Sequence, residues 1–79
     1  MNNLEKYNEV FTKVFGVKAD VLGSGFSSDS VEDWDSVHQL NIIAELEDGF
    51  DLMLDPEDIV ALTSYDAGLE VLRKYGVEI

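Results

Sequence analysis

Very few residues of this sequence are of a type that carries out chemistry, because it has one histidine and no cysteine. Cysteine nucleophiles, disulfides and thiolate zinc sites are therefore excluded, and a lone histidine cannot build a transition-metal site. A hydrolase triad would need His38 to activate Ser36, yet residues two apart on a helix do not face each other. The acidic segment 29–35 lacks the glycine and the closing glutamate of an EF-hand loop. We expect no catalytic residue, no metal site and no enzymatic activity of the chain alone.

One serine does occupy a position that suits covalent modification. Ser36 follows Trp34 and Asp35 where a long loop meets a predicted helix, so its hydroxyl should be exposed at the helix start. Backbone N–H groups without partners and the positive end of the helix dipole would accommodate a phosphate ester there. An alternative is a capping box over residues 36–39, in which Ser36 caps the helix and Gln39 reaches back.

Helices must position this serine, because apolar residues recur at helical spacing along most of the chain. The first helix should begin at a cap from Asn2 or Asn3 and end at Gly16, with a buried stripe of Leu4, Tyr7, Phe11, Val14 and Phe15. The second should bury Val37, Leu40, Ile43, Leu46 and Phe50 and expose His38, Asn41, Glu45 and Asp48.

Two further helices are predicted in the C-terminal half. Asp55 and Pro56 are typical of a helix start, and the short helix that follows has Ile59 and Leu62 as its apolar contacts. Thr63 or Ser64 should cap the last helix, which buries Leu69, Leu72 and Tyr75. The loop 17–35 should be ordered, and pinned to the core by Val17, Val21, Leu22, Phe26, Val31 and Trp34.

The sequence therefore predicts one all-α domain over residues 1–79. It should be a small bundle of three main helices plus one short helix, with a long ordered loop between helices one and two. A hydrophobic content of 46% in 79 residues suits a small core and excludes a disordered acidic tail.

Acidic residues dominate the surface chemistry. The net charge is −12, and fourteen acids but no Lys or Arg lie between Lys18 and Arg73. Such a surface repels nucleic acid and anionic membranes and attracts basic patches on other proteins. The simpler alternative is that the acids keep a small protein soluble. No apolar run is long enough to span a bilayer, so we expect a cytoplasmic protein. Because of its acidic surface we expect it to bind neither nucleic acid nor membrane, and we expect a monomer.

The run from Trp34 to Leu72 resembles the acyl carrier protein family. The family pattern is Asp-Ser-Leu at a loop–helix junction, then apolar positions, Leu-Glu, an acid, Phe and a turn into a short helix with an acidic start. Here these features are Asp35-Ser36-Val37, Leu40, Ile43, Leu46-Glu47, Asp48, Phe50-Asp51, Leu54, Glu57-Asp58-Ile59 and Thr63.

This resemblance implies that Ser36 carries a 4′-phosphopantetheine arm. A phosphopantetheinyl transferase would add the arm from coenzyme A with magnesium, with Asp35 assisting its metal or orientation and Val37 contacting it. The thiol of the arm would carry acyl groups as thioesters between acyl-loading and acyl-transfer enzymes that have basic surface patches. The family's acyl cavity matches Leu46, Leu54, Ile59 and Leu62, each of which can also be an ordinary core side chain.

Besides Val37, which stands where the family has leucine, two positions depart from the family pattern. Fatty-acid carriers are often acidic two and five residues beyond the serine, whereas His38 and Asn41 stand there in this chain. Glu47 and Asp48 keep their acids, which moves the partner-binding negative charge toward the end of the helix. We therefore expect a carrier for a dedicated pathway of fatty-acid, polyketide or similar biosynthesis, rather than the general fatty-acid carrier. His38 is either a donor to the attached phosphate or a solvated side chain.

Two other functions stay open from the sequence. The chain could be an acidic helical module that binds a basic partner without covalent modification, with Ser36 only as a helix cap. It could also be a divalent-cation sensor that uses the carboxylates of the loop and the second helix, although gradual stabilisation by cations is the expected behaviour of such an acidic protein.

Overall fold

The chain folds into four α-helices, as seen in a computed structural model that describes residues 2–79. These are α1 (Asn3–Phe15), α2 (Ser36–Phe50), α3 (Pro56–Ala61) and α4 (Tyr65–Lys74), and a 3-10 helix, η1 (Ala19–Val21), lies within the long loop. Over the described residues no β-strand forms, and the only bridge joins Ser27 to Ser64. The predicted all-α bundle of three main helices and one short helix is confirmed.

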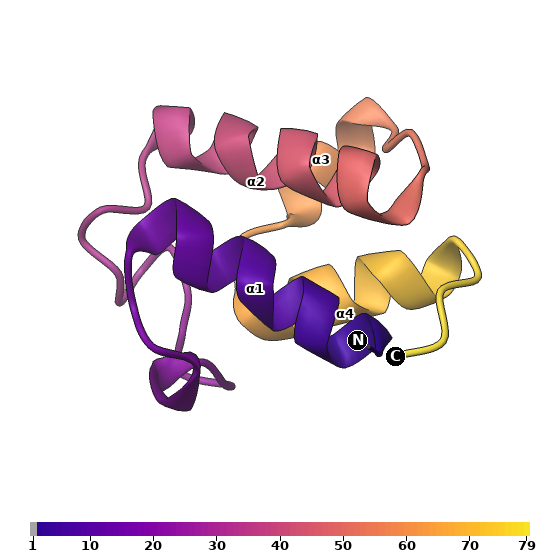
Figure 1. Cartoon of the computed structure of the whole chain (residues 1–79). Helices are drawn as coiled ribbons and strands as arrows, with labels where there is room; N and C mark the ends of the chain where they lie inside the picture. The colour runs from indigo at the N-terminus through magenta and orange to yellow at the C-terminus, as the bar shows by residue number, and fades with distance from the viewer. Residues whose placement is uncertain (1) are drawn as a thin grey trace.

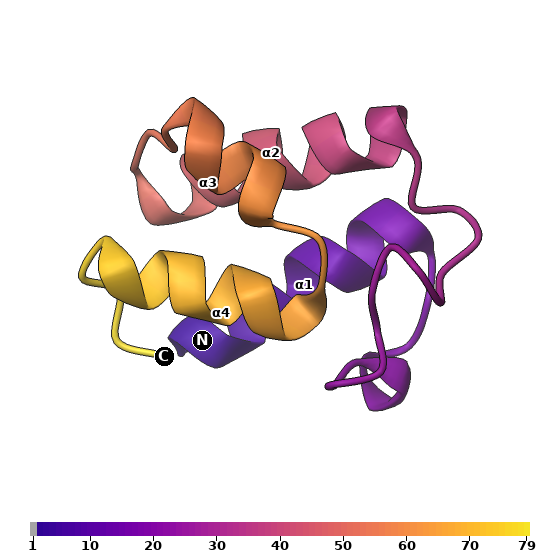
Figure 2. The same cartoon turned by 180° about the vertical axis from the view of Figure 1, so that it is seen from behind.

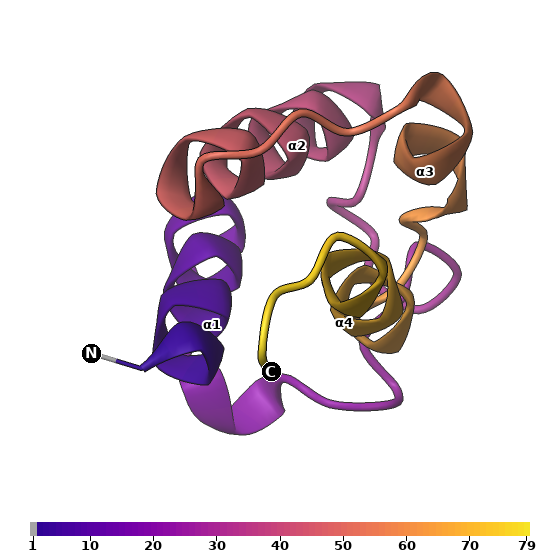
Figure 3. The ribbon, with the colours of Figure 1, turned by 90° about the vertical axis from the view of Figure 1, so that its right-hand side faces the viewer.

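The helices pack around one core (Figure 1). α2 runs antiparallel to α1, because the start of α1 meets the end of α2 at Lys6 and Phe50 while Lys13 pairs with Glu45. Seen from behind, α4 lies in front of α1 and α3 lies above α4 (Figure 2). The end-on view places α3 at the corner between α2 and α4 (Figure 3).

The predicted helix boundaries agree closely with the structure, because short polar side chains cap three of the four helices. Asn2 accepts a hydrogen bond from the Glu5 N–H at 2.8 Å, and Gly16 ends α1 in the left-handed conformation with φ of 65°. Ser64 caps α4 by accepting from the Ala67 N–H at 3.0 Å. These caps satisfy N–H groups that a helix leaves without internal partners.

The long loop is held by two aromatic side chains and by its pairing with the start of α4. Phe26 and Trp34 are buried within the aromatic cluster around Phe11, with ring centroids 5.9 Å from it. The Ser28 N–H donates to the Thr63 carbonyl at 2.8 Å, which fixes the loop against the α3–α4 connection. Val21 was expected to pin the loop as well, but it is 53% exposed on η1. The loop is therefore ordered without that contact.

The predicted buried stripe of α2 is partly wrong. Val37 and Leu40 are 64% and 63% exposed, whereas Ile42 is fully buried beside Ile43 and Leu46. A helix turns about 100° per residue, so each step of three residues falls about 60° short of a full turn. Residues 37 and 46 therefore lie on opposite sides of the helix, and the face with Leu46 packs into the core. The apolar residues in the first two turns of α2, Val37 and Leu40, consequently face solvent.

Candidate functional site

Ser36 is the first residue of α2 and is exposed. Its hydroxyl takes part in none of the hydrogen bonds found among residues 2–79. The N–H groups of a first helical turn have no partners within the helix, and the dipole adds positive potential there. The side chain is thus free to react and lies in an environment that favours an attached phosphate.

Asp35, and not Ser36, caps the helix. One Asp35 carboxylate oxygen accepts from the His38 N–H at 2.9 Å and lies 2.8 Å from Nδ1 of the His38 ring. These bonds, the backbone one first, hold the pKa of Asp35 below its usual range. An ionised carboxylate only accepts, so Nδ1 of His38 donates. The capping box that would have given Ser36 a purely structural role is absent.

The same tripeptide occurs six residues earlier, where the serine is engaged. Asp29-Ser30-Val31 repeats the order of Asp35-Ser36-Val37. Ser30 Oγ donates to the Gly25 carbonyl at 2.5 Å and accepts from the Ser27 N–H at 3.1 Å, so it holds a turn of the loop. The surroundings of the two serines therefore differ although their sequences do not.

His38 packs against α1 instead of projecting freely into solvent. Its ring stacks on Phe15 with centroids 5.3 Å apart and an angle of 12° between the planes. Its side chain is 30% exposed, and the bond from Nδ1 to Asp35 fixes its orientation. His38 lies two residues beyond Ser36, on a different side of the helix.

Beyond the Asp35 cap, the exposed surface of α2 is uncharged in its first half and acidic at its far end. Val37, Leu40 and Asn41 are exposed in the first half of the helix. Asp48 is exposed in the last turn, followed by Asp51. Two of the residues expected to meet partners, Asn41 and Asp48, are thus accessible on one surface.

Glu47, also expected to meet partners, is used within the fold. It is half-buried, and Oε2 accepts a hydrogen bond from the Leu54 N–H at 2.8 Å. This bond fixes the connection between α2 and α3. The acidic charge that partners can reach at this end of α2 therefore comes mainly from Asp48 and Asp51.

Gln39 has a role that the sequence did not reveal. Its side-chain amide donates to the carbonyls of Ile59 and Leu62, at 2.8 and 2.9 Å. Its carbonyl oxygen accepts from the indole N–H of Trp34 at 2.5 Å. One side chain thus joins the start of α2 to the loop before it and to the end of α3. A capping box was the only use foreseen for this residue, because these partners are distant in the sequence.

The four residues matched to an acyl cavity lie in the core or at its edge. Leu46 and Leu62 are fully buried, Leu54 is buried and Ile59 is half-buried. All four belong to the hydrophobic core or pack against it.

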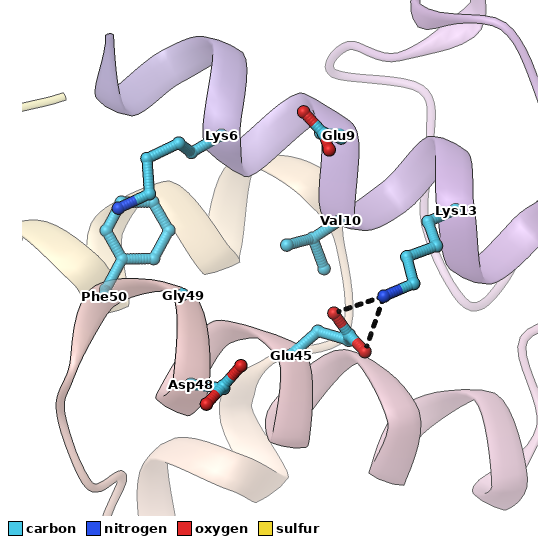
Figure 4. A pocket seen from close by; sticks show the side chains of 8 residues that line it. All are labelled: Lys6, Glu9, Val10, Lys13, Glu45, Asp48, Gly49 and Phe50. Carbon is cyan, nitrogen blue, oxygen red and sulfur yellow. Dashed lines mark hydrogen bonds and ion pairs between the residues drawn. The ribbon is translucent and has the colours of Figure 1, made fainter. Parts of the chain in front are cut away.

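A groove lies elsewhere, between α1 and α2, with a volume of about 250 Å³. Both helices line the groove, α1 with Val10 among charged side chains and α2 with Gly49 beside Asp48. Lys13 binds Glu45 across it at 3.1 Å (Figure 4). Lys6 lies over the Phe50 ring, 4.7 Å from its centre. These contacts tie the two helices together and leave the groove at a distance from Ser36 along α2.

Among residues 2–79, no three His, Cys, Asp or Glu side chains gather in a way that could hold a metal ion. None of the described helices is long and apolar enough to cross a membrane. Searches against protein-family models, curated proteins and solved structures found no match to this chain.

Proposed function

We propose that this chain is an acyl carrier protein, which carries acyl groups as thioesters on a 4′-phosphopantetheine arm attached to Ser36. The observation that carries the proposal is the free Ser36 hydroxyl at the first residue of α2, beside a cap supplied by Asp35. The resemblance of residues 34–72 to the carrier family supplies the identity of the group.

The residues at this site fit a phosphodiester. Ser36 Oγ has no competing role, and the first-turn N–H groups and the helix dipole favour its negative charge. The bonds to His38 lower the pKa of Asp35 further below the neutral range in which any ordinary aspartate is already ionised. An ionised Asp35 suits the proposed role beside the magnesium of a phosphopantetheinyl transferase, because Mg²⁺ prefers carboxylate oxygens.

The attachment reaction needs no reactant other than Ser36 and coenzyme A. Ser36 Oγ forms a bond to the phosphorus of the phosphopantetheine portion of coenzyme A, and the pyrophosphate bond breaks. Adenosine bisphosphate leaves, and the serine proton is lost to solvent. The bound arm supplies the thiol that this cysteine-free chain lacks.

The exposed side chains of α2 favour partners whose surfaces are basic in one part and apolar in another. Basic side chains of a partner would meet Asp48 and Asp51, and apolar side chains would meet Val37 and Leu40. Because His38 and Asn41 stand where fatty-acid carriers often have acids, partners of a dedicated pathway are favoured over those of general fatty-acid synthesis. Such partners include the transferase and the enzymes that load and remove the acyl group.

The test is the mass of the intact chain after incubation with coenzyme A, magnesium and a broad-specificity phosphopantetheinyl transferase. We expect the mass to rise by one phosphopantetheine unit in the wild type and in Ser30→Ala, and to stay unchanged in Ser36→Ala. Ser30→Ala is the matched control because it removes the serine of the repeated Asp-Ser-Val tripeptide. An unmodified wild type, or equal modification of Ser36→Ala, would contradict the proposal.

A second candidate function is an acidic interaction module, which the net charge of −12 favours. Such a module would bind its basic partner equally well with Ser36→Ala. A carrier with the same substitution would keep its fold and lose all acyl transfer. Partner affinity and acyl transfer measured on that one variant therefore separate the two functions.

A further inference from the structure

The amide of Gln39 lies across the seam between α2 and α3, at the end nearest Ser36. Along α2, Gln39 stands one turn beyond Ser36 and about two turns before Leu46. Both of its donor hydrogens are used, one on the Ile59 carbonyl and one on the Leu62 carbonyl. A chain that entered the core from Ser36 along this seam would have to displace this amide.

Other contacts hold α3 at its opposite end. Asp58 accepts from Lys74 Nζ at 2.8 Å and from the Tyr75 hydroxyl at 2.5 Å. The Tyr75 oxygen also accepts from the Asp55 N–H at 2.9 Å. Opening the seam would therefore strain polar contacts at both ends of a six-residue helix.

The surface outside this seam offers an apolar environment. Val37 and Leu40 beside Ser36 are 64% and 63% exposed, and Val60 on α3 is 76% exposed. The hydrophobic core contains the fully buried Ile42, Leu46 and Leu62. Apolar contact is thus available to a tethered group without any displacement of the core.

We propose that Gln39 keeps the seam between α2 and α3 closed, so that an acyl group carried at Ser36 stays outside the bundle. The proposal rests on the function proposed above and adds how the cargo is presented. Gln39 acts as a positioning residue, because it excludes long acyl chains from the core and leaves every chain length accessible to partner enzymes.

The first measurement uses the chain without an arm. Amide hydrogen exchange at Ile59 and Leu62 should become severalfold faster in Gln39→Met and Gln39→Ala, because both variants lose the bonds to α3. Gln39→Met keeps the size of the side chain and so separates the lost bonds from an opened space. Asn41→Ala, an exposed change on the same helix, should leave the exchange unchanged. Equal exchange in all variants would overturn the role of Gln39.

The second measurement loads butanoyl, octanoyl or dodecanoyl arms with the transferase and follows cleavage of the thioester by hydroxylamine. The wild type should lose all three groups at the same rate. In Gln39→Ala the longer groups should be cleaved severalfold more slowly, because they can enter the core. A residue that only supported stability would not create a dependence on chain length.

Two results would overturn the inference while leaving the carrier function intact. One is slower cleavage of dodecanoyl than of butanoyl in the wild type, and the other is equal cleavage of all lengths in Gln39→Ala. Failure to attach any arm, seen as an unchanged mass, would instead overturn the carrier function and the cargo inference with it. The exchange measurement would still decide whether Gln39 holds α3.

Discussion

The hydroxyl of Tyr7 occupies the space that a side chain at position 68 would need. A Cβ atom on Gly68 would lie 2.1 Å from Tyr7 Oη, which is far inside van der Waals contact. Tyr7 is fully buried and donates to the Tyr65 carbonyl at 2.5 Å. Burial also raises the pKa of Tyr7, so its hydroxyl stays a donor at any ordinary pH. The close packing of α1 on α4 therefore requires glycine at this position.

Gly68→Ala should destabilise the protein by about 1–3 kcal/mol, the usual effect of adding a methyl group to a filled core. Gly49→Ala is the matched control, because its Cβ would meet nothing within 4 Å on the surface of α2. That change should stabilise the protein by up to about 1 kcal/mol through helix propensity. Chemical denaturation of both variants gives the two free energies of unfolding.

Tyr7→Phe tests whether the contact with Tyr7 Oη is what destabilises Gly68→Ala. Gly68→Ala should cost less in the Tyr7→Phe background, because the oxygen that it meets is gone. Additive effects of the two substitutions would show that another contact causes the destabilisation.

Ser36→Ala should change the free energy of unfolding by no more than about 0.5 kcal/mol, because its hydroxyl has no partner and Asp35 forms the cap. Ser64→Ala should cost about 1 kcal/mol, since Ser64 accepts from the Ala67 N–H. Thermal or chemical unfolding of the two serine variants measures the contrast. A larger loss in Ser36→Ala than in Ser64→Ala would show that Ser36 has a structural role.

Stability at low pH should depend on Asp58. Its bonds from Lys74 and Tyr75 hold the pKa of this buried carboxyl below its usual value of 3.8. A carboxyl whose pKa is lower in the folded state contributes stability above its unfolded pKa and loses it as the pH falls through the folded pKa. Asp58→Asn should therefore lower the thermal midpoint at neutral pH.

The difference between wild type and Asp58→Asn should shrink as the pH falls below the unfolded pKa of 3.8. Thermal unfolding followed at several pH values measures it. A difference that stays constant from neutral to acidic pH would mean that the carboxylate charge plays no part in holding α3 to α4.

Added salt should stabilise this chain, because the negative charges of the folded state, −12 in net, repel one another. Thermal unfolding across a salt series measures this effect.

Lys13→Met removes the partner of Glu45 and should lower the free energy of unfolding by less than about 1 kcal/mol, since the pair is largely exposed. Lys18→Met removes the same charge without breaking a detected ion pair. Thermal unfolding across a salt series compares the variants, and equal losses in both would show that the Lys13–Glu45 pair contributes nothing.

Local signals made most of the fold predictable. Asn2, Gly16, Pro56 and Ser64 act within a few residues of their own position, so the helix boundaries could be derived from the sequence alone. The orientation of α2 about its axis was harder, because apolar residues occur on more than one side of it. Burial of Ile42 instead of Leu40 depends on what α1 and α3 present, and this is a tertiary effect.

The candidate site was predictable to a similar extent. A serine at the start of a helix follows from the loop–helix junction, and the structure has Ser36 there. The identity of the cap was not decided, because Asp35 and Ser36 are both good capping residues. Gln39 gave no signal, since its partners Ile59 and Leu62 lie at least twenty residues away.

The first turn of α1 and the C-terminal segment meet at the side of the molecule away from the start of α2 (Figure 1). Asn3 Nδ2 donates to the Glu78 carbonyl at 2.9 Å, and this bond fastens the C-terminal segment to the first turn of α1. An affinity tag, a surface anchor or a fused protein at either end would consequently leave Ser36 unobstructed. A short peptide link between the ends should give a circular or permuted version that keeps the same helices.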